Sequence, residues 1–98
     1  MLDIVRITSK KDVPQFSALF KRYMLELGEE DKSDEFMVSI FTRFDNPGML
    51  LLIAMYENEP VGFIWAHPVS KFGENYLRIS EIYADKHNIG MALFGEAI

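Results

Sequence analysis

The stretch YLRISEIYADKHNIGMALFGEAI, residues 76–98, decides the fold that we predict for this chain. It begins with the alternation of a β-strand, in which successive side chains point to opposite faces. On this pattern, one face of the strand carries Leu77, Ile79, Glu81 and Tyr83. The polar run DKHN at 85–88 interrupts the alternation, and the run that starts at Gly90 suits a helix.

A strand that leads directly into a helix forms a candidate anion-binding site. The first amide N–H groups of a helix have no hydrogen-bond partner within the helix, and the helix dipole favours negative charge beside them. Gly90 has no side chain that would crowd a phosphate group near the backbone. We therefore predict an anion site at this junction.

The composition indicates one small acidic domain over residues 1–98. Hydrophobic residues make up 49% of the chain, which argues against disorder, and no apolar run approaches the ~20 residues of a membrane span. The net charge of −5 at pH 7 argues against nucleic-acid binding, which usually requires a basic surface. The N-terminus lacks the basic and apolar regions of a signal peptide, so we expect a cytoplasmic protein that binds no membrane.

The chain contains no cysteine and two histidines, His67 and His87. Disulfides, thiolate metal sites and a cysteine nucleophile are excluded. Neither histidine has a partner at metal-ligand spacing, so we predict no metal site. His67 follows an apolar run, where a catalytic role and a surface role at a strand end both stay open.

Hydrophobic periodicity predicts the other elements. Two helices are expected, one between a cap at Ser9 or Asp12 and the stop at Gly28, and one between Ser33 or Asp34 and the turn DNPG. The first has an apolar stripe that we expect in the core, at Val13, Phe16, Phe20, Tyr23, Met24 and Leu27. Three further strands are expected at 4–8, 49–56 and 61–66. The last two are apolar on both faces and form an antiparallel hairpin, after which we predict a polar loop at 70–75.

The predicted order is therefore β-α-α-β-β-β-α. Strands that are apolar on both faces need cover on both faces. We therefore predict an α/β (α+β) fold, with a mostly antiparallel sheet between helices.

This order resembles the GNAT superfamily of N-acetyltransferases, which transfer an acetyl group from acetyl-CoA to an amine. The residues that carry the resemblance are IVRIT at 4–8 with KDVP at 11–14, LLIAMY at 51–56 with PVGFIW at 60–65, and ISEIYAD at 79–85 with IGMALF at 89–94. The resemblance implies the N-terminal half of the acyl-CoA N-acyltransferase fold. A complete member continues with a fifth strand, a fourth helix and two more strands, so we expect residues 1–98 to be an incomplete acetyltransferase domain.

The acyl-CoA signature of the family is altered in this chain. The family places Arg or Gln, two residues, Gly, one residue and then Gly or Ala after the fourth strand. Aligned on Gly90, this sequence has Asn88 in place of the first Gly and Asp85 in place of Arg or Gln. The loop from Tyr83 to Gly90 is also several residues short, which leaves fewer amides for a pyrophosphate.

The resemblance implies roles for individual residues. Glu81 is placed to act as the general base, directly or through water, while an exposed glutamate paired with a lysine is the alternative. Backbone groups of the strand are expected to hold the pantetheine arm and the thioester carbonyl, at Ile82, Tyr83 and Ala84. The amides expected to bind the pyrophosphate belong to Asn88, Ile89, Gly90, Met91 and Ala92.

Three side chains have secondary roles in this prediction. Lys86 and His87 add positive charge near the pyrophosphate. Tyr83 is a candidate general acid, although a tyrosine beside a sheet more often packs.

The expected acceptor is a small-molecule or peptide amine. The acidic run Glu29, Glu30 and Asp31 lies in the loop that borders the acceptor side in the family. A solvated linker is the simpler interpretation, and attraction of a cationic acceptor, such as a polyamine, a basic peptide or an amino sugar, is the sharper one. The edge of the strand 77–84 also predicts a homodimer, in which two such strands pair.

Three functions are consistent with these observations. The first is an N-acetyltransferase that uses acetyl-CoA as co-substrate. The second is a catalytically inactive acyl-CoA-binding or interaction module, favoured by the altered signature. The third is a half-domain that acts only after pairing with another chain.

Overall fold

The computed structural model describes residues 2–84 and 87–97, of which 87, 88, 91, 94 and 97 are described by their backbone alone. The predicted order of helices and strands is confirmed, with two short 3₁₀ helices (η) in addition. The elements are β1 (Leu2–Arg6), η1 (Lys10–Phe16), α1 (Ser17–Glu26), η2 (Glu30–Lys32), α2 (Ser33–Arg43), β2 (Leu50–Tyr56), β3 (Glu59–Lys71), β4 (Glu74–Ala84) and α3 (His87–Ala97). The strands form one antiparallel sheet in the order β1-β2-β3-β4.

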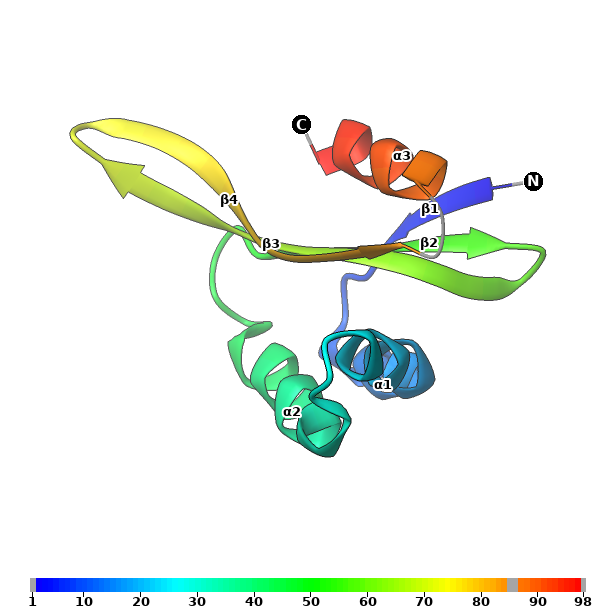
Figure 1. The fold of residues 1–98 in the computed structure, drawn as a ribbon. Helices are drawn as coiled ribbons and strands as arrows, with labels where there is room; N and C mark the ends of the chain where they lie inside the picture. Colours follow the sequence, from blue (N-terminus) through cyan, green and yellow to red (C-terminus); the bar gives the residue numbers. More distant parts are fainter. Residues whose placement is uncertain (1, 85–86, 98) are drawn as a thin grey trace.

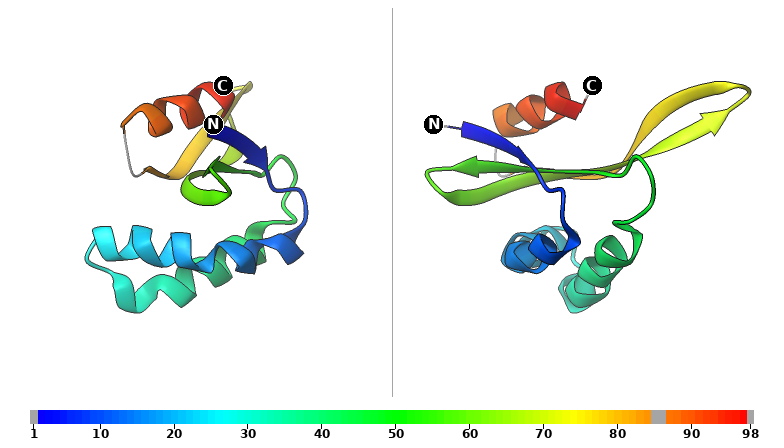
Figure 2. Two further views of the ribbon diagram at one scale, coloured as in Figure 1. Left: turned by 90° about the vertical axis from the view of Figure 1, so that its right-hand side faces the viewer. Right: turned by 180° about the vertical axis from the view of Figure 1, so that it is seen from behind.

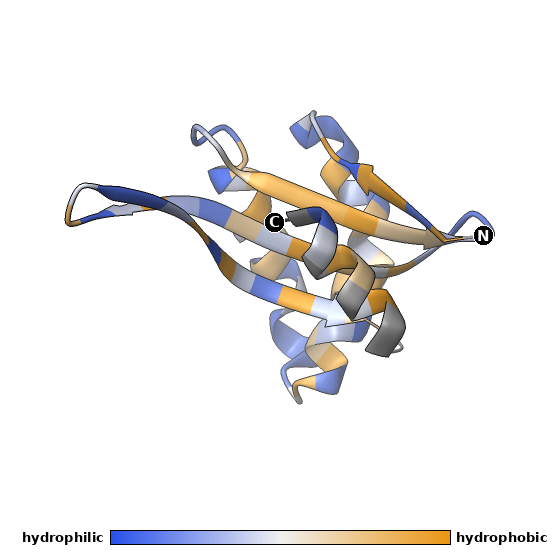
Figure 3. Cartoon of the chain, turned by 90° about the horizontal axis from the view of Figure 1, so that it is seen from above, coloured by the Kyte–Doolittle hydropathy of each residue, from blue (hydrophilic) through white to orange (hydrophobic). Residues whose placement is uncertain are grey.

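The sheet is the middle of three layers. Helices α1 and α2 cover one face, and α3 crosses the other (Figures 1 and 2). Strand β2 contributes to both interfaces, because Leu51 and Ile53 are buried with α1 and α2, whereas Leu52 and Ala54 are buried with α3. The prediction that this strand needs cover on both faces is confirmed. Figure 3 shows α3 crossing the face of the sheet opposite α1 and α2.

The core beneath α1 and α2 is largely aromatic. The ring of Phe20 meets Phe63 edge to face, with 5.2 Å between the ring centroids, and meets Phe36 in the same way at 5.7 Å. Such pairs add specific geometry to the burial of apolar area. The predicted stripe of the first helix is confirmed at the buried residues Val13, Phe16, Phe20, Tyr23 and Met24.

The ends of this helical segment follow the predicted capping. Ser9 is the N-cap, since its side chain accepts a hydrogen bond from the Lys11 amide. The segment begins as a 3₁₀ helix around Pro14 and continues as α1. Gly28, with φ of +74°, follows the end of α1. Leu27, predicted in the buried stripe, is 55% exposed because it lies at the C-cap.

The hairpin of β3 and β4 is longer than predicted. Strand β3 continues through His67 and Pro68 to Lys71, and β4 begins at Glu74, so the polar loop predicted at 70–75 is shorter than expected and comprises residues 72–73 alone. Strand β2 pairs with β3 only as far as Ala66. Beyond that point β3 has β4 as its one neighbour in the sheet, and a strand edge tolerates a proline. The resulting arm projects beyond the helices in Figure 1.

The tip of the arm is a two-residue turn. Phe72 and Gly73 both have positive φ, 55° and 79°, as the turns favoured in two-residue hairpins require. Glycine adopts this conformation without strain, whereas phenylalanine does so rarely. The apolar residue at this position explains why the sequence pattern indicated a longer loop here and not a two-residue turn.

Candidate functional site

A β-bulge at Ser80 sets the direction of Glu81. Trp65 of β3 lies opposite Glu81, whereas the next residue, Ala66, lies opposite Ile79, so Ser80 is an extra residue in β4. The bulge reverses the alternation of faces along the strand. Our assignment of Leu77, Ile79, Glu81 and Tyr83 to one face is therefore wrong: Ile79 packs in the core beneath α3, and Tyr83 packs in the core beneath α1 and α2.

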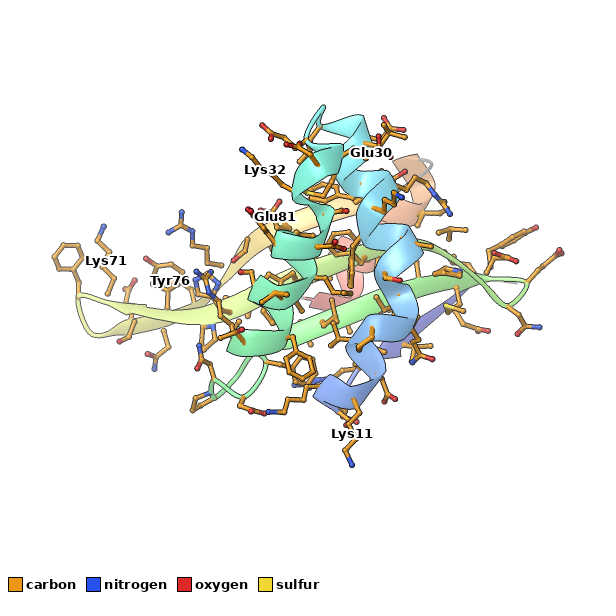
Figure 4. The ribbon with its side chains drawn as sticks, turned by 90° about the horizontal axis from the view of Figure 1, so that it is seen from below. Lys11, Glu30, Lys32, Lys71, Tyr76 and Glu81 are labelled. Carbon is orange, nitrogen blue, oxygen red and sulfur yellow. The ribbon has the colours of Figure 1, made fainter. Side chains whose placement is uncertain are left out.

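Glu81 lies on the face that α1 and α2 cover. The Tyr23 hydroxyl, from α1, donates a short hydrogen bond to the Glu81 carboxylate. Burial of the hydroxyl, and then its bond to Glu81, raise the pKa of Tyr23 well above 10.0. Tyr23 therefore stays protonated and keeps donating at neutral pH. Figure 4 labels Glu81 in a view from the side of the sheet that α1 and α2 cover.

Aromatic packing holds Tyr23 in place. Its ring centroid lies 5.2 Å from that of Phe63, 5.4 Å from that of Phe36 and 5.6 Å from that of Tyr83. Sequence reasoning assigned Tyr23 to the core stripe and missed its polar role. A tyrosine within a stripe of phenylalanines is an indication of such a role, because a buried hydroxyl requires a partner.

Ile82, Tyr83 and Ala84, the predicted pantetheine-binding residues, form the end of β4. They pair with β3 on one side, and β4 is an edge of the sheet in the part of the chain that the structure describes. Their backbone groups on the other side therefore lie at the edge where an extended ligand can pair. The Tyr83 ring, our candidate acid, packs in the aromatic cluster with Tyr23.

Gly62 brings the end of β4 close to β3 and α3. A Cβ atom at Gly62 would lie 2.7 Å from the Tyr83 carbonyl oxygen and 3.2 Å from Ile89 Cγ2. Gly62 therefore permits close backbone packing at this point. A side chain at this position would displace the end of β4 or α3.

Helix α3 spans His87–Ala97, so it begins before Gly90, and the predicted start is wrong. His87 and Asn88, which we assigned to the loop, have helical backbone. Asp85 and Lys86 lie outside the described residues.

Because α3 begins earlier than predicted, fewer of the predicted amides are free to bind the pyrophosphate. Within a helix each amide bonds to the carbonyl four residues earlier, so the amides of Met91 and Ala92 are directed to carbonyls of the first turn. Asn88 and Ile89 lie in the first turn of the described helix. Ile89 is also buried against the sheet, as is Leu93 one turn later. Gly90 lies over the end of β4, since a Cβ there would meet Ala84 Cβ at 3.7 Å.

His67 and Ser80 form a second polar pair on the sheet. The Ser80 hydroxyl oxygen lies 2.7 Å from His67 Nδ1. His67 also lines a cavity of about 280 Å³, together with Arg43, Asn46, Pro47, Met49, Trp65 and Pro68. His67 therefore lines a cavity, and it does not lie at a strand end, because β3 continues to Lys71.

The acidic run of the predicted acceptor side lies at η2, where Figure 4 labels Glu30 and Lys32. Lys32 Nζ lies 3.0 Å from Glu29, and this pairing raises the pKa of the lysine. The negative charge of this acidic run is thus partly neutralised by Lys32. Among the described residues, no group of three His, Asp or Glu side chains is arranged to hold a metal ion, and none of the helices described has the length and apolar character of a membrane span.

Comparison of the sequence with protein families and with curated proteins finds no match. Comparison of the structure finds acetyltransferases. An aminoglycoside acetyltransferase from an uncultured soil metagenomic sample superposes with a TM-score of 0.79 and 16% identity, over 99% of this chain and 69% of that chain. The ribosomal-protein-alanine N-acetyltransferase of Brucella melitensis biovar Abortus 2308 gives 0.74 and 18%, over 99% and 69%.

A third structure was solved with acetyl-CoA. A predicted acetyltransferase from Clostridium acetobutylicum, solved with acetyl-CoA, gives a TM-score of 0.73 and 15% identity, over 98% of this chain and 70% of that chain. Identities this low show a shared fold, and each match spans about 70% of the larger protein. The chain therefore has the fold of the GNAT acetyltransferases, over a portion of that fold consistent with its N-terminal part.

Proposed function

We propose that this chain carries the acetyl-CoA-binding edge and the general base of an N-acetyltransferase. The observation that supports the proposal most directly is the position of Glu81. A bulge turns this carboxylate to the face that α1 and α2 cover, and Tyr23 orients it there. The carboxylate thus lies beside a strand edge whose backbone groups suit an extended ligand.

The reaction requires a proton acceptor for the amine. The amine nitrogen attacks the thioester carbonyl carbon, the amine loses a proton, and the C–S bond breaks to release the thiolate of CoA, which takes up a proton. Glu81 accepts the amine proton, directly or through one water. Tyr23 fixes the orientation of the carboxylate and does not itself transfer the proton, because its raised pKa keeps it protonated.

Acetyl-CoA is expected along the end of β4 and at α3. Backbone groups of Ile82, Tyr83 and Ala84 pair with the pantetheine arm and orient the carbonyl, and the first-turn amides of α3 attract the pyrophosphate. Tyr83 is the proposed donor of a proton to the thiolate. The acceptor is an amine, for which the acidic run at Glu29, Glu30 and Asp31 offers weak long-range attraction.

Binding and turnover separate this proposal from its main alternative. We expect calorimetric titration with acetyl-CoA to show a one-to-one complex, and an assay for free CoA to show release that depends on added amine. The altered signature at Asp85 and Asn88 favours the alternative, an inactive acyl-CoA-binding module. Binding without amine-dependent release would establish that alternative, and no binding would reject both.

A further inference from the structure

The cavity beside the His67–Ser80 pair is lined by hydrogen-bond donors and a cation. Arg43 is a cation at the end of α2, and the side chains of Asn46 and Trp65 add an amide and an indole N–H. Met49 and two prolines supply apolar wall, and the lining includes no carboxylate. A cavity with this lining favours an anionic group on a small ligand.

Arg43 is available to such a ligand. Its side chain is exposed, and it forms no ion pair with any other residue that the structure describes. The nearest acid in sequence, Asp45, lies 2.9 Å from Lys10 Nζ and is thereby occupied. The guanidinium group can therefore form a two-point contact with a carboxylate or a phosphate.

His67, which also lines the cavity, can add a further donor. When the Ser80 hydroxyl donates to Nδ1, the second ring nitrogen, Nε2, carries the hydrogen and donates in turn. A protonated ring would donate from both nitrogens. Ser80 is the bulge residue, so the bulge that turns Glu81 also supports His67.

The cavity is next to the proposed base. Trp65, which lines it, is the residue of β3 opposite Glu81, and His67 lies two residues further along the same face of β3. Two residues of strand correspond to about 7 Å. With the ~4.8 Å between neighbouring strands included, the Cα atoms of Glu81 and His67 are about 8–9 Å apart. An amine and an oxyanion held between these two side chains would then be about 7 Å apart.

We propose that the acceptor carries an oxyanion, a carboxylate or a phosphate, about 7 Å from the amine that is acetylated. This inference rests on the proposed function for the role of the amine, whereas the oxyanion site stands on the cavity itself. A free α-amino acid is too short for the span, while a dipeptide or a phosphorylated amine of similar length suits it.

Matched pairs of ligands test the inference directly. Glycylglycine and glycylglycinamide differ only in the terminal carboxylate, and 2-aminoethyl phosphate and ethanolamine differ only in the phosphate. Trp65 is the sole tryptophan and lines the cavity, so its fluorescence reports occupancy, with calorimetry as a second measurement. We expect each anionic ligand to bind at least tenfold more tightly than its neutral partner, and the tighter of the two anionic ligands identifies the oxyanion.

Variants identify the residues that hold the anion. Arg43→Met is expected to weaken binding of the preferred anionic ligand at least tenfold and to leave the neutral ligand unchanged, with Arg43→Lys in between. Lys11→Met is the matched control, because Lys11 is an exposed cation outside the cavity lining (Figure 4). Thermal melts confirm that each variant is folded.

The outcomes separate the inference from the proposed function. Equal affinity within both ligand pairs, or no effect of Arg43→Met in a folded protein, would overturn the inference even if acetyl transfer were observed. Binding of the anionic ligands that depends on Arg43, without CoA release for any amine, would support the oxyanion site and reject the proposed transferase.

Discussion

Glu81 is the residue on which the proposed chemistry depends. Glu81→Gln keeps the shape and the hydrogen bond to Tyr23 but removes the capacity to accept a proton. We expect the acetylation rate to fall by roughly 10²–10⁴ with acetyl-CoA affinity nearly unchanged. A coupled assay for free CoA and calorimetry measure the two effects. An unchanged rate, in protein with measurable activity, would remove Glu81 from the mechanism.

Tyr23 gives the protein a specific sensitivity to alkaline pH. Burial, and then the bond to Glu81, raise its pKa in the folded state above the ordinary 10.0. Its contribution to stability is therefore fully present below pH 10 and is lost as the pH rises toward the raised pKa, because the unfolded chain ionises first. Urea unfolding between pH 9 and 12 should show a steeper loss of stability for the wild type than for Tyr23→Phe. Parallel pH dependence would contradict the burial of this hydroxyl.

The sequence alone could not predict that Tyr23 pairs with Glu81. The two residues are 58 positions apart, and their contact depends on a bulge that leaves no mark in the pattern of apolar residues. Glu81 itself was identified because the family resemblance marks its position. The cavity at Arg43 and His67 was missed for the same physical reason, since it joins the end of α2 to the middle of β3.

The element order, in contrast, was predictable. Apolar periodicity of 3.6 in the helices and unbroken apolar runs in β2 and β3 indicate which segments must be covered. The hairpin arm was not predictable. Beyond Ala66, β3 and β4 pair with each other but β3 no longer pairs with β2, and the two strands carry polar residues in no regular order. The start of α3 was placed too late because His87 and Asn88 are common loop residues.

At the level of elements, helix α3 provides a matched test of the phosphate site. Gly90 lies over Ala84 at the strand end, while a Cβ at Gly95 would meet nothing within 4 Å. Gly90→Val should weaken acetyl-CoA binding by crowding the approach of the pyrophosphate, and Gly95→Val should not. Both changes alter helix propensity equally, so calorimetry with circular dichroism isolates the effect of position. Equal affinity in the two variants would locate the pyrophosphate elsewhere.

At the level of the molecule, the edge that β4 forms in the described part of the chain leads us to predict self-association. Tyr76, Leu77 and Ile82 are exposed along it, and exposed edges recruit other strands. We expect light scattering after size exclusion to show a dimer that dissociates on dilution. Leu77→Lys should weaken the dimer, whereas Val38→Lys, an equal change on α2, should not. A mass of one chain at every concentration would refute the dimer.

The bulge at Ser80 makes one codon dispensable to the facing of β4. Deleting Ser80 would leave Ile79 opposite Ala66 and Glu81 opposite Trp65 in an uninterrupted ladder, so each remaining residue keeps its face. Glu81 would still face Tyr23, whereas His67 would lose the hydroxyl beside its Nδ1. An in-frame loss of these three nucleotides should therefore yield a folded protein that keeps the alkaline sensitivity due to Tyr23 and binds the proposed oxyanion less tightly. In a scan of single-codon deletions along 74–84, loss of this alkaline sensitivity at Ser80 would show that the bulge itself holds Glu81 at Tyr23.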